Sequence, residues 1–251
     1  MSVVRAEWVK FRSLRSVLWA SVVVVALMAG IGALFSLGQA RAFMTKGSGL
    51  DPTAASLSGV LLAQIAVGVL GVLVVTSEFA SDSIRSSLAA VPVRGRLLAA
   101  KAATVTAVAL LIGWVGGLAA FVVGQVVIDG QGAPSASLTD SGVPRALLGA
   151  GLYLAVTALF GLAVGAMIRS TAGALTVVIV VMLTVPIFSA AFPEGIARWI
   201  AKWWPSMAGL RVLTTVRDPS VLGPWPGLAV LTGFAAVVLA SSFAVFARRD
   251  V

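Results

Sequence analysis

Residues 102–128 read AATVTAVALLIGWVGGLAAFVVGQVVI, a run without a single Lys, Arg, Asp or Glu. A helix needs about 20 apolar residues to cross the hydrocarbon core of a bilayer, and this run is longer than that. The rest of the chain has the same character, because 59% of its 251 residues are hydrophobic and only 11% are charged. Such a composition lies far outside the range of soluble domains and indicates an integral membrane protein.

Five further uncharged runs are long enough to cross a membrane. We therefore expect an all-α protein with a single transmembrane domain over residues 1–251. Pro186 predicts a kink in the fifth span, since proline removes a backbone donor. Only Arg169 separates the fourth and fifth spans, which predicts a tight turn. The six expected spans cover approximately residues 16–40, 54–77, 102–128, 146–168, 170–193 and 226–247.

The distribution of positive charge predicts the orientation of the chain. The N-terminus, the second and fourth loops and the C-terminus together hold 11 Lys and Arg residues, whereas the opposite side holds 7. Positive residues are preferentially retained in the cytoplasm, so we expect both termini there. The first uncharged run is longer than the apolar region of a signal peptide, and this favours a retained first helix.

Two segments outside the spans have the pattern of helices that lie in a membrane interface. In the fifth loop, Trp199, Trp203 and Trp204 fall on one helical face, with Arg198 and Lys202 opposite. This pattern predicts an interfacial or re-entrant helix in the outer leaflet, with a tryptophan-rich solvated loop as the alternative.

The N-terminal segment has a similar pattern before the first span. Val4, Trp8 and Phe11 share one helical face, and the basic residues lie largely elsewhere. This arrangement fits either an interfacial helix or simply the positive anchor of the first span.

Missing residue types exclude several classes of function. The chain contains neither histidine nor cysteine, which excludes Ser-His catalysis, His-Glu-x-x-His zinc sites and thiolate chemistry. It also lacks a Gly-x-x-x-x-Gly-Lys-[Ser/Thr] loop, and its segments outside the spans are too short to contain a nucleotide-binding domain. We therefore expect no enzyme activity, no catalytic residue, no metal site and no cofactor in this chain.

The net charge of +9 does not indicate a nucleic-acid partner. The basic residues are spread beside the span ends, where lipid headgroups and membrane topology account for them. The expected spans contain no charged residue, although carriers driven by ion gradients usually place one inside the helix bundle. If the protein moves a substrate uphill, we expect the energy to come from another protein.

A short amphipathic segment follows the second span. Residues 76–101 read TSEFASDSIRSSLAAVPVRGRLLAAK, and a helix over residues 79–91 would place Ile84, Leu88 and Val91 on one stripe before Pro92 ends it. An apolar stripe of this kind can insert into a groove on a cytoplasmic partner. The alternative is a connector that runs parallel to the membrane.

This segment, together with the opening RAEWVKFRSLRS at residues 5–16, resembles the transmembrane subunits of type-2 ABC transporters, the ABC-2 type permeases of exporter-like character. The resemblance implies a coupling helix from Glu78 to Pro92 that docks on a separate ABC ATPase subunit. Asp82 departs from this pattern, because relatives often have a small glycine there. The coupling residues implied by the resemblance are Glu78, Phe79, Asp82, Ile84, Arg85, Leu88 and Pro92.

The resemblance also implies partners and a pathway. Such permeases work as pairs, so we expect a second permease subunit, identical or homologous, in a bacterial plasma membrane, with ATP and magnesium bound by the ATPase. The second and fifth spans would line the pathway, and their polar residues Gln64, Thr76, Thr176 and Thr184 could face it. The glycine pairs Gly113/Gly117 and Gly161/Gly165 would allow close helix packing.

Two other classes of protein share these sequence features. One is a channel or a carrier driven by a gradient, which would need no ATPase. The other is a membrane assembly or immunity protein that transports nothing. The uncharged spans suggest a hydrophobic or amphipathic cargo for a transporter, but lipid-facing helices have the same composition.

Overall fold

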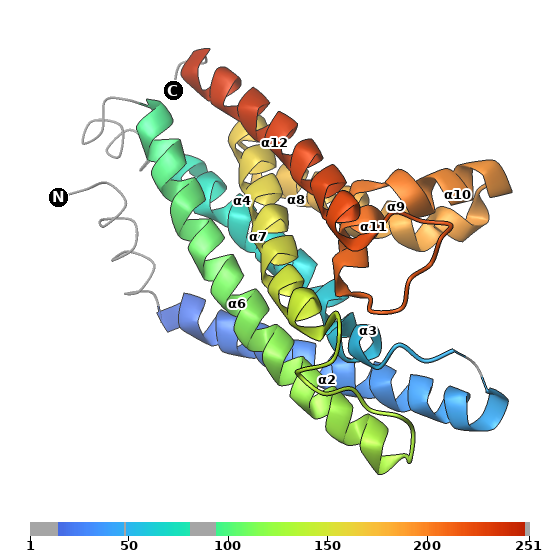
Figure 1. The fold of residues 1–251 in the computed structure, drawn as a ribbon. Helices are drawn as coiled ribbons and strands as arrows, with labels where there is room; N and C mark the ends of the chain where they lie inside the picture. Colours follow the sequence, from blue (N-terminus) through green and yellow to red (C-terminus); the bar gives the residue numbers. More distant parts are fainter. Residues whose placement is uncertain (1–14, 48, 81–93, 249–251) are drawn as a thin grey trace.

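A computed structural model describes residues 15–47, 49–80 and 94–248 of the chain. These residues form helices joined by turns and loops and include no strand, which confirms the expected all-α fold (Figure 1). The elements are α2 (Arg15–Lys46), α3 (Pro52–Ser56), η1 (Leu57–Gly59), α4 (Val60–Ala80), α6 (Arg94–Gly130), α7 (Val143–Ile168), α8 (Thr171–Ile179), η2 (Val180–Thr184), α9 (Val185–Ile187), η3 (Phe188–Ala191), α10 (Glu194–Trp203), α11 (Pro205–Leu210), η4 (Arg211–Leu213) and α12 (Pro224–Arg248).

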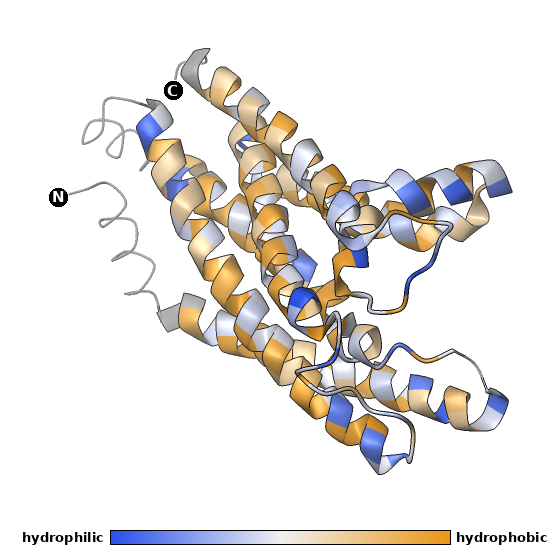
Figure 2. Ribbon diagram, in the orientation of Figure 1, coloured by the Kyte–Doolittle hydropathy of each residue, from blue (hydrophilic) through white to orange (hydrophobic). Residues whose placement is uncertain are grey.

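Six helical segments are long and apolar enough to cross a membrane, as the sequence predicts. Figure 2 shows hydrophobic residues along these segments and hydrophilic ones mainly near their ends and along α10. The segments are Leu18–Lys46, Pro52–Ala80, Gly95–Gly130, Val143–Ile168, Thr171–Ala191 and Pro224–Phe246.

The helices continue beyond the uncharged runs. The second segment passes Glu78 and the third includes Arg96, Lys101 and Asp129, whereas the uncharged runs end before these residues. Glu78 and Lys101 form an ion pair with each other.

Helix α7 lies at the centre of the fold. It packs against α4, α6, α8 and α12, and α2 packs mainly against α6 (Figure 1). The side chains of Tyr153, Leu154 and Phe160 on α7 are fully or almost fully buried. The core of the bundle therefore forms around α7, and α2 lies at its edge.

Glycines allow the close approach of α7 to its neighbours. A Cβ atom added to Gly161 would lie 2.3 Å from the carbonyl oxygen of Gly68 on α4. One added to Gly113 on α6 would lie 2.5 Å from the Cα atom of Gly151 on α7. Both contacts use glycines from the two Gly-x-x-x-Gly pairs in the sequence, and they place helix backbones in direct contact.

The fourth and fifth spans are joined by a tight turn, as expected. Arg169 ends α7 in the left-handed conformation, with φ of 58°, and its backbone N–H donates to the Gly165 carbonyl at 2.9 Å. The fifth span then departs from a simple kink at Pro186. It contains a π turn, η2, followed by the short α9 and the 3₁₀ turn η3.

The helix expected in the fifth loop is present as α10. It ends at Trp203, and a new helix, α11, begins at Pro205 because proline is favoured in the first turn of a helix. Trp199 and Trp203 are 55% and 44% exposed, whereas Ile200 is buried. The position of α10 in the outer leaflet remains a prediction.

Candidate functional site

The predicted coupling segment lies partly outside the described residues. Asp82, Ile84, Arg85, Leu88 and Pro92 all fall within residues 81–93, and the expected N-terminal interfacial helix falls within residues 1–14. The structure does describe the two helix ends that flank the coupling segment. These are the last turns of α4, with Glu78 and Phe79, and the first turns of α6.

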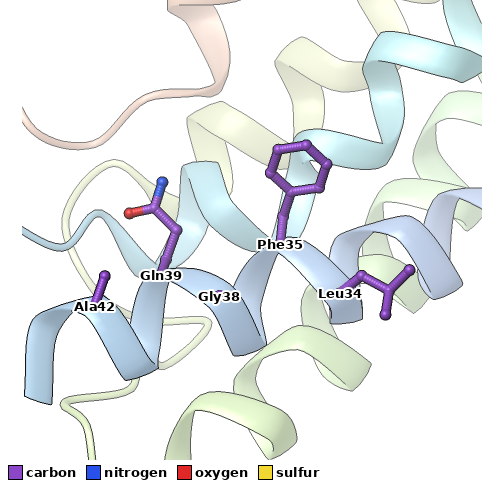
Figure 3. A pocket seen from close by; sticks show the side chains of 5 residues that line it. All are labelled: Leu34, Phe35, Gly38, Gln39 and Ala42. Atoms are coloured by element: carbon purple, nitrogen blue, oxygen red, sulfur yellow. The ribbon is translucent and has the colours of Figure 1, made fainter. Parts of the chain in front are cut away.

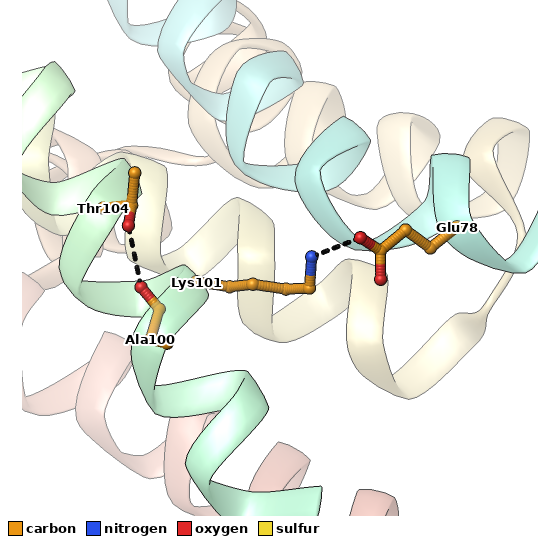
Figure 4. A network of polar contacts seen from close by, with 4 residues as sticks. All are labelled: Glu78, Ala100, Lys101 and Thr104. Carbon is orange, nitrogen blue, oxygen red and sulfur yellow. Dashed lines mark hydrogen bonds and ion pairs between the residues drawn. The ribbon is translucent and has the colours of Figure 1, made fainter. Parts of the chain in front are cut away.

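A buried ion pair joins these two helix ends. Lys101 Nζ on α6 donates to Glu78 Oε1 on α4 at 2.7 Å (Figure 4). The two side chains are only 3% and 4% exposed, so water screens their attraction weakly. Removing one partner of such a pair is strongly destabilising, because it leaves the other charge buried without compensation.

Aromatic and cationic contacts extend this site to two further helices. The guanidinium carbon of Arg169 lies 5.1 Å from the centre of the Phe79 ring, within the range of a cation–π interaction. The ring of Phe246 on α12 packs edge-on against the ring of Phe79, with 6.3 Å between the two ring centres. The Phe79 cluster, formed by Glu78, Phe79, Lys101, Arg169 and Phe246, therefore connects α4, α6, α7 and α12.

In the sequence, Lys101 counts as one of the basic residues of the second loop, and its contact with Glu78 was not predicted. The signal was nevertheless present. Glu78 directly follows the second uncharged run and Lys101 directly precedes the third. Consecutive spans are antiparallel, so the end of one and the start of the next lie on the same side of the membrane and opposite charges there can meet.

The predicted pathway residues of the second span lie inside the helix packing. Gln64 is 1% exposed, accepts a hydrogen bond from the Tyr153 hydroxyl and donates from Nε2 to the Met182 carbonyl at 3.3 Å. Thr76 is fully buried and donates to the Val72 carbonyl at 3.1 Å. The structure thus brings Gln64 into contact with the fifth span.

The other two predicted pathway residues occupy different environments. Thr176 is exposed on α8 and donates to the Ala172 carbonyl at 2.9 Å. Thr184 is partly buried in the π turn and donates to the Ile179 carbonyl at 3.4 Å. The four residues do not form one polar cluster, and their role in a pathway remains a prediction.

An open hollow lies along the edge helix α2. Its volume is about 520 Å³, and it is lined by Leu34, Phe35, Gly38, Gln39 and Ala42. Phe35, Gln39 and Ala42 point to one side of the helix, whereas Leu34 points away from them (Figure 3). A single amide on an apolar wall offers no catalytic chemistry, and the hollow resembles a lipid-facing surface.

A second polar site, which was also not predicted, lies near α3 at the other end of the bundle (Figure 1). The Asp51 carboxylate caps α3 by accepting from the Ala54 N–H at 2.9 Å. It also accepts from the Thr215 N–H and hydroxyl, both at 2.7 Å, and from the Val216 N–H at 2.9 Å. This Asp51 clasp ties α3 to the segment that leads into α12.

Within the described ranges, no group of three or more Asp or Glu side chains could hold a metal ion. The most deeply buried charges are those of Glu78 and Lys101, which are paired where two helices meet. The Phe79 cluster can therefore fix the relative positions of four helices.

Comparison with known proteins identifies the family. The sequence matches the ABC-2 family transporter protein over residues 3–189, which include the first four spans and most of the fifth. No curated protein matches the chain significantly. The family match covers well over half of the chain and agrees with its six apolar helices. The chain therefore belongs to the ABC-2 family of transporter proteins and is a multi-pass membrane protein with the role of a permease.

Proposed function

We propose that this permease is the membrane subunit of an ATP-driven exporter. It pairs with a second permease subunit, identical or homologous, and the two form the translocation pathway between them. A separate ABC ATPase binds ATP and magnesium and supplies the energy. The observation that carries the proposal is the buried ion pair between Glu78 and Lys101. This pair joins the two helix ends that flank residues 81–93, the segment through which motion would enter.

The ion pair determines how a force on this segment is distributed. Glu78 lies just before residues 81–93 and Lys101 lies two turns into the helix that follows them. A buried pair with good geometry resists separation, since its partners would otherwise be left as uncompensated charges. A push on the segment would therefore move α4 and α6 together rather than bend one of them.

The aromatic contacts of Phe79 extend the same motion. Arg169 belongs to the turn between the fourth and fifth spans, and Phe246 belongs to the last span. Both contact Phe79, which is adjacent to Glu78. Displacement of the last turn of α4 would therefore reach α7, α8 and α12 directly.

In the proposed mechanism, ATP binding closes a pair of ATPase subunits, and their movement pushes on residues 78–92. The permease subunits then change the side of the membrane to which they open. The chain itself hydrolyses nothing and contributes binding, force transmission and the pathway. Its bacterial plasma-membrane location, with both termini in the cytoplasm, belongs to the same proposal.

The docking role can be tested by co-purification with the cognate ABC ATPase. Ile84→Asp and Leu88→Asp place charges on the apolar stripe and are expected to abolish co-purification and the stimulation of ATPase activity. Ser86→Asp introduces the same charge on another face of the segment and serves as the matched control. Binding and activity that survive both stripe substitutions would exclude this docking role.

Transport assays separate the proposal from its alternatives. For an exporter, substrate movement in proteoliposomes requires the ATPase and stops with vanadate. Movement by the permease alone would indicate a channel or a gradient-driven carrier. No vanadate-sensitive movement, even with a bound and active ATPase, would indicate a membrane assembly or immunity protein.

A further inference from the structure

The break in the fifth span leaves two backbone carbonyls without their usual partners. In an α-helix, the carbonyl of residue 181 would accept from the N–H of residue 185, and that of residue 182 from residue 186. In the π turn, the Val185 N–H instead donates to the Val180 carbonyl. Pro186 has no N–H to donate. The carbonyls of Val181 and Met182 are therefore both free of these helical bonds.

Side chains from two other parts of the chain bind these carbonyls. Trp204, which lies between α10 and α11, donates from Nε1 to the Val181 carbonyl at 2.7 Å. Gln64 on α4 donates from Nε2 to the Met182 carbonyl at 3.3 Å. Within a bilayer, backbone groups freed by proline need such replacements, because no water is present to bind them.

Gln64 is itself held in the orientation that this contact needs. The Tyr153 hydroxyl on α7 donates to Gln64 Oε1, which leaves the amide nitrogen facing Met182. Gln64, Tyr153 and Met182 are each no more than 1% exposed. Hydrogen bonds in the interior of the bundle thus connect α7 to α4 and α4 to the fifth span.

We infer that Gln64 and Trp204 are positioning residues that hold the fifth span in its broken conformation. They connect that break to the second span on one side and to the outer helix α10 on the other. This inference deepens the proposed transport function, on which its consequence for transport rests, since motion of α4 would shift the break through Gln64. The role of Gln64 and Trp204 in the conformation of the fifth span does not depend on an ATPase.

The absence of cysteine in the chain makes a spectroscopic test direct. Spin labels at Leu148→Cys on α7 and Ile187→Cys on α9 report the position of the outer part of the fifth span, and both sites are more than half exposed. A second pair, Leu148→Cys and Leu34→Cys, does not involve the fifth span and serves as the control. Distances are measured on the full-length permease in lipid nanodiscs.

Three substitutions remove the bonds while keeping similar side-chain volume. Trp204→Phe removes one donor and is expected to raise the population of a displaced fifth span about fivefold, the ratio that follows from one lost hydrogen bond of ordinary strength. Gln64→Leu removes both the donor to the Met182 carbonyl and the acceptor of the Tyr153 hydroxyl, and it is expected to have a larger effect. Tyr153→Phe only releases the Gln64 amide and is expected to have a smaller effect. Gln39→Leu and Trp199→Phe alter an exposed glutamine and an exposed tryptophan and are the matched controls.

A suppressor distinguishes positioning from a general structural role or from pathway lining. Pro186→Ala supplies a backbone N–H that can bind the Met182 carbonyl in an α-helical turn. The double variant Gln64→Leu/Pro186→Ala is therefore expected to recover a narrow distance distribution in the test pair. A distribution as broad as that of Gln64→Leu alone, with an unchanged control pair, would overturn the inference.

Transport by the assembled complex separates this inference from the proposed function. Gln64→Leu is expected to reduce ATP-dependent transport while co-purification with the ATPase persists, and Pro186→Ala is expected to restore part of the loss. Failure of the unmodified chain to bind the ATPase would contradict the proposed function. The distance measurements would then still decide whether Gln64 and Trp204 position the fifth span. Unchanged distances in both Gln64→Leu and Trp204→Phe would contradict the inference whatever the ATPase does.

Discussion

Helices α7 and α2 have nearly equal mean hydropathy, 2.1 and 2.3 in their most apolar 18-residue windows, yet 72% of the α7 window is buried and only 17% of the α2 window. The difference lies in where small residues face a neighbour. On α7, Cβ atoms added to the glycines at positions 149, 151, 161 and 165 would all come within 3.1 Å of a neighbour, whereas on α2 only Gly32 has such a contact and Gly30 and Gly38 have nothing within 4 Å. Hydropathy therefore specifies which segments enter the membrane, and small residues in contact specify which segment becomes the centre.

The largest expected effect is at the charged contact between two helices that pack on α7. Lys101→Met is expected to destabilise the fold by about 3–5 kcal/mol, because it removes the cation that contacts the buried Glu78 carboxylate at 2.7 Å. Arg41→Met on α2 removes an exposed cation and is expected to cost no more than about 0.5 kcal/mol. Unfolding in detergent micelles measures both changes.

A double variant sharpens the first test. Glu78→Leu/Lys101→Met removes both charges and is expected to recover most of the stability that Lys101→Met loses. It should nevertheless lose coupling to the ATPase, since the base of the coupling segment is no longer fixed by charge. Equal instability of the single and double variants would show that loss of the Glu78–Lys101 contact, and not the charge that remains on Glu78, determines the effect.

Truncating a core leucine tests the burial difference directly. Leu154→Ala on α7 creates a cavity and is expected to destabilise the fold by about 2–5 kcal/mol. Leu34 on α2 is 68% exposed, so Leu34→Ala is expected to change the unfolding free energy little. Similar losses in the two variants would mean that α2 is covered in the functional assembly, for example by a second permease subunit.

Adding one methyl group tests the glycine contacts. Gly161→Ala forces α7 away from the Gly68 carbonyl and is expected to cost about 1–3 kcal/mol. Gly38→Ala on α2 meets open space and is expected to be neutral or slightly stabilising, because alanine favours helix. Thermal unfolding of the two variants in the same detergent gives the comparison.

The smallest expected effect is in the Asp51 clasp, which ties α3 to the segment that leads into α12. Asp51→Asn keeps one carbonyl oxygen but loses the charge that accepts four hydrogen bonds, and it is expected to cost about 1 kcal/mol. Asp129→Asn, at an exposed position near the end of α6, is the control. Hydrogen exchange of residues 214–216 is expected to rise in Asp51→Asn alone.

Much of the fold could be predicted from the sequence because span length, charge-free runs and the single-residue turn at Arg169 are local features. The amphipathic helix near Trp199 and the break at Pro205 are local as well. The ends of α4 and α6 could not be predicted from the uncharged runs, since both helices continue past charged residues.

The contacts that define the candidate sites could not be predicted in the same way. Gln64 binds a carbonyl 118 residues away, and Asp51 binds backbone groups 164 and 165 residues away. No local pattern encodes such pairings, and a polar residue in an apolar run has the same appearance whether it lines a pathway or caps a carbonyl. The contacts of Gln64 therefore could not be predicted without the position of the π turn in the fifth span.

Arg169 illustrates how little freedom one position can retain. Its backbone has φ of 58°, a conformation that glycine and asparagine adopt most readily, while its guanidinium group lies against the Phe79 ring. Glycine or asparagine would relax the backbone but lose the cation, and valine or isoleucine would satisfy neither requirement. In a library of all amino acids at position 169, we expect arginine and lysine to survive selection for transport, although neither would be chosen for the turn alone.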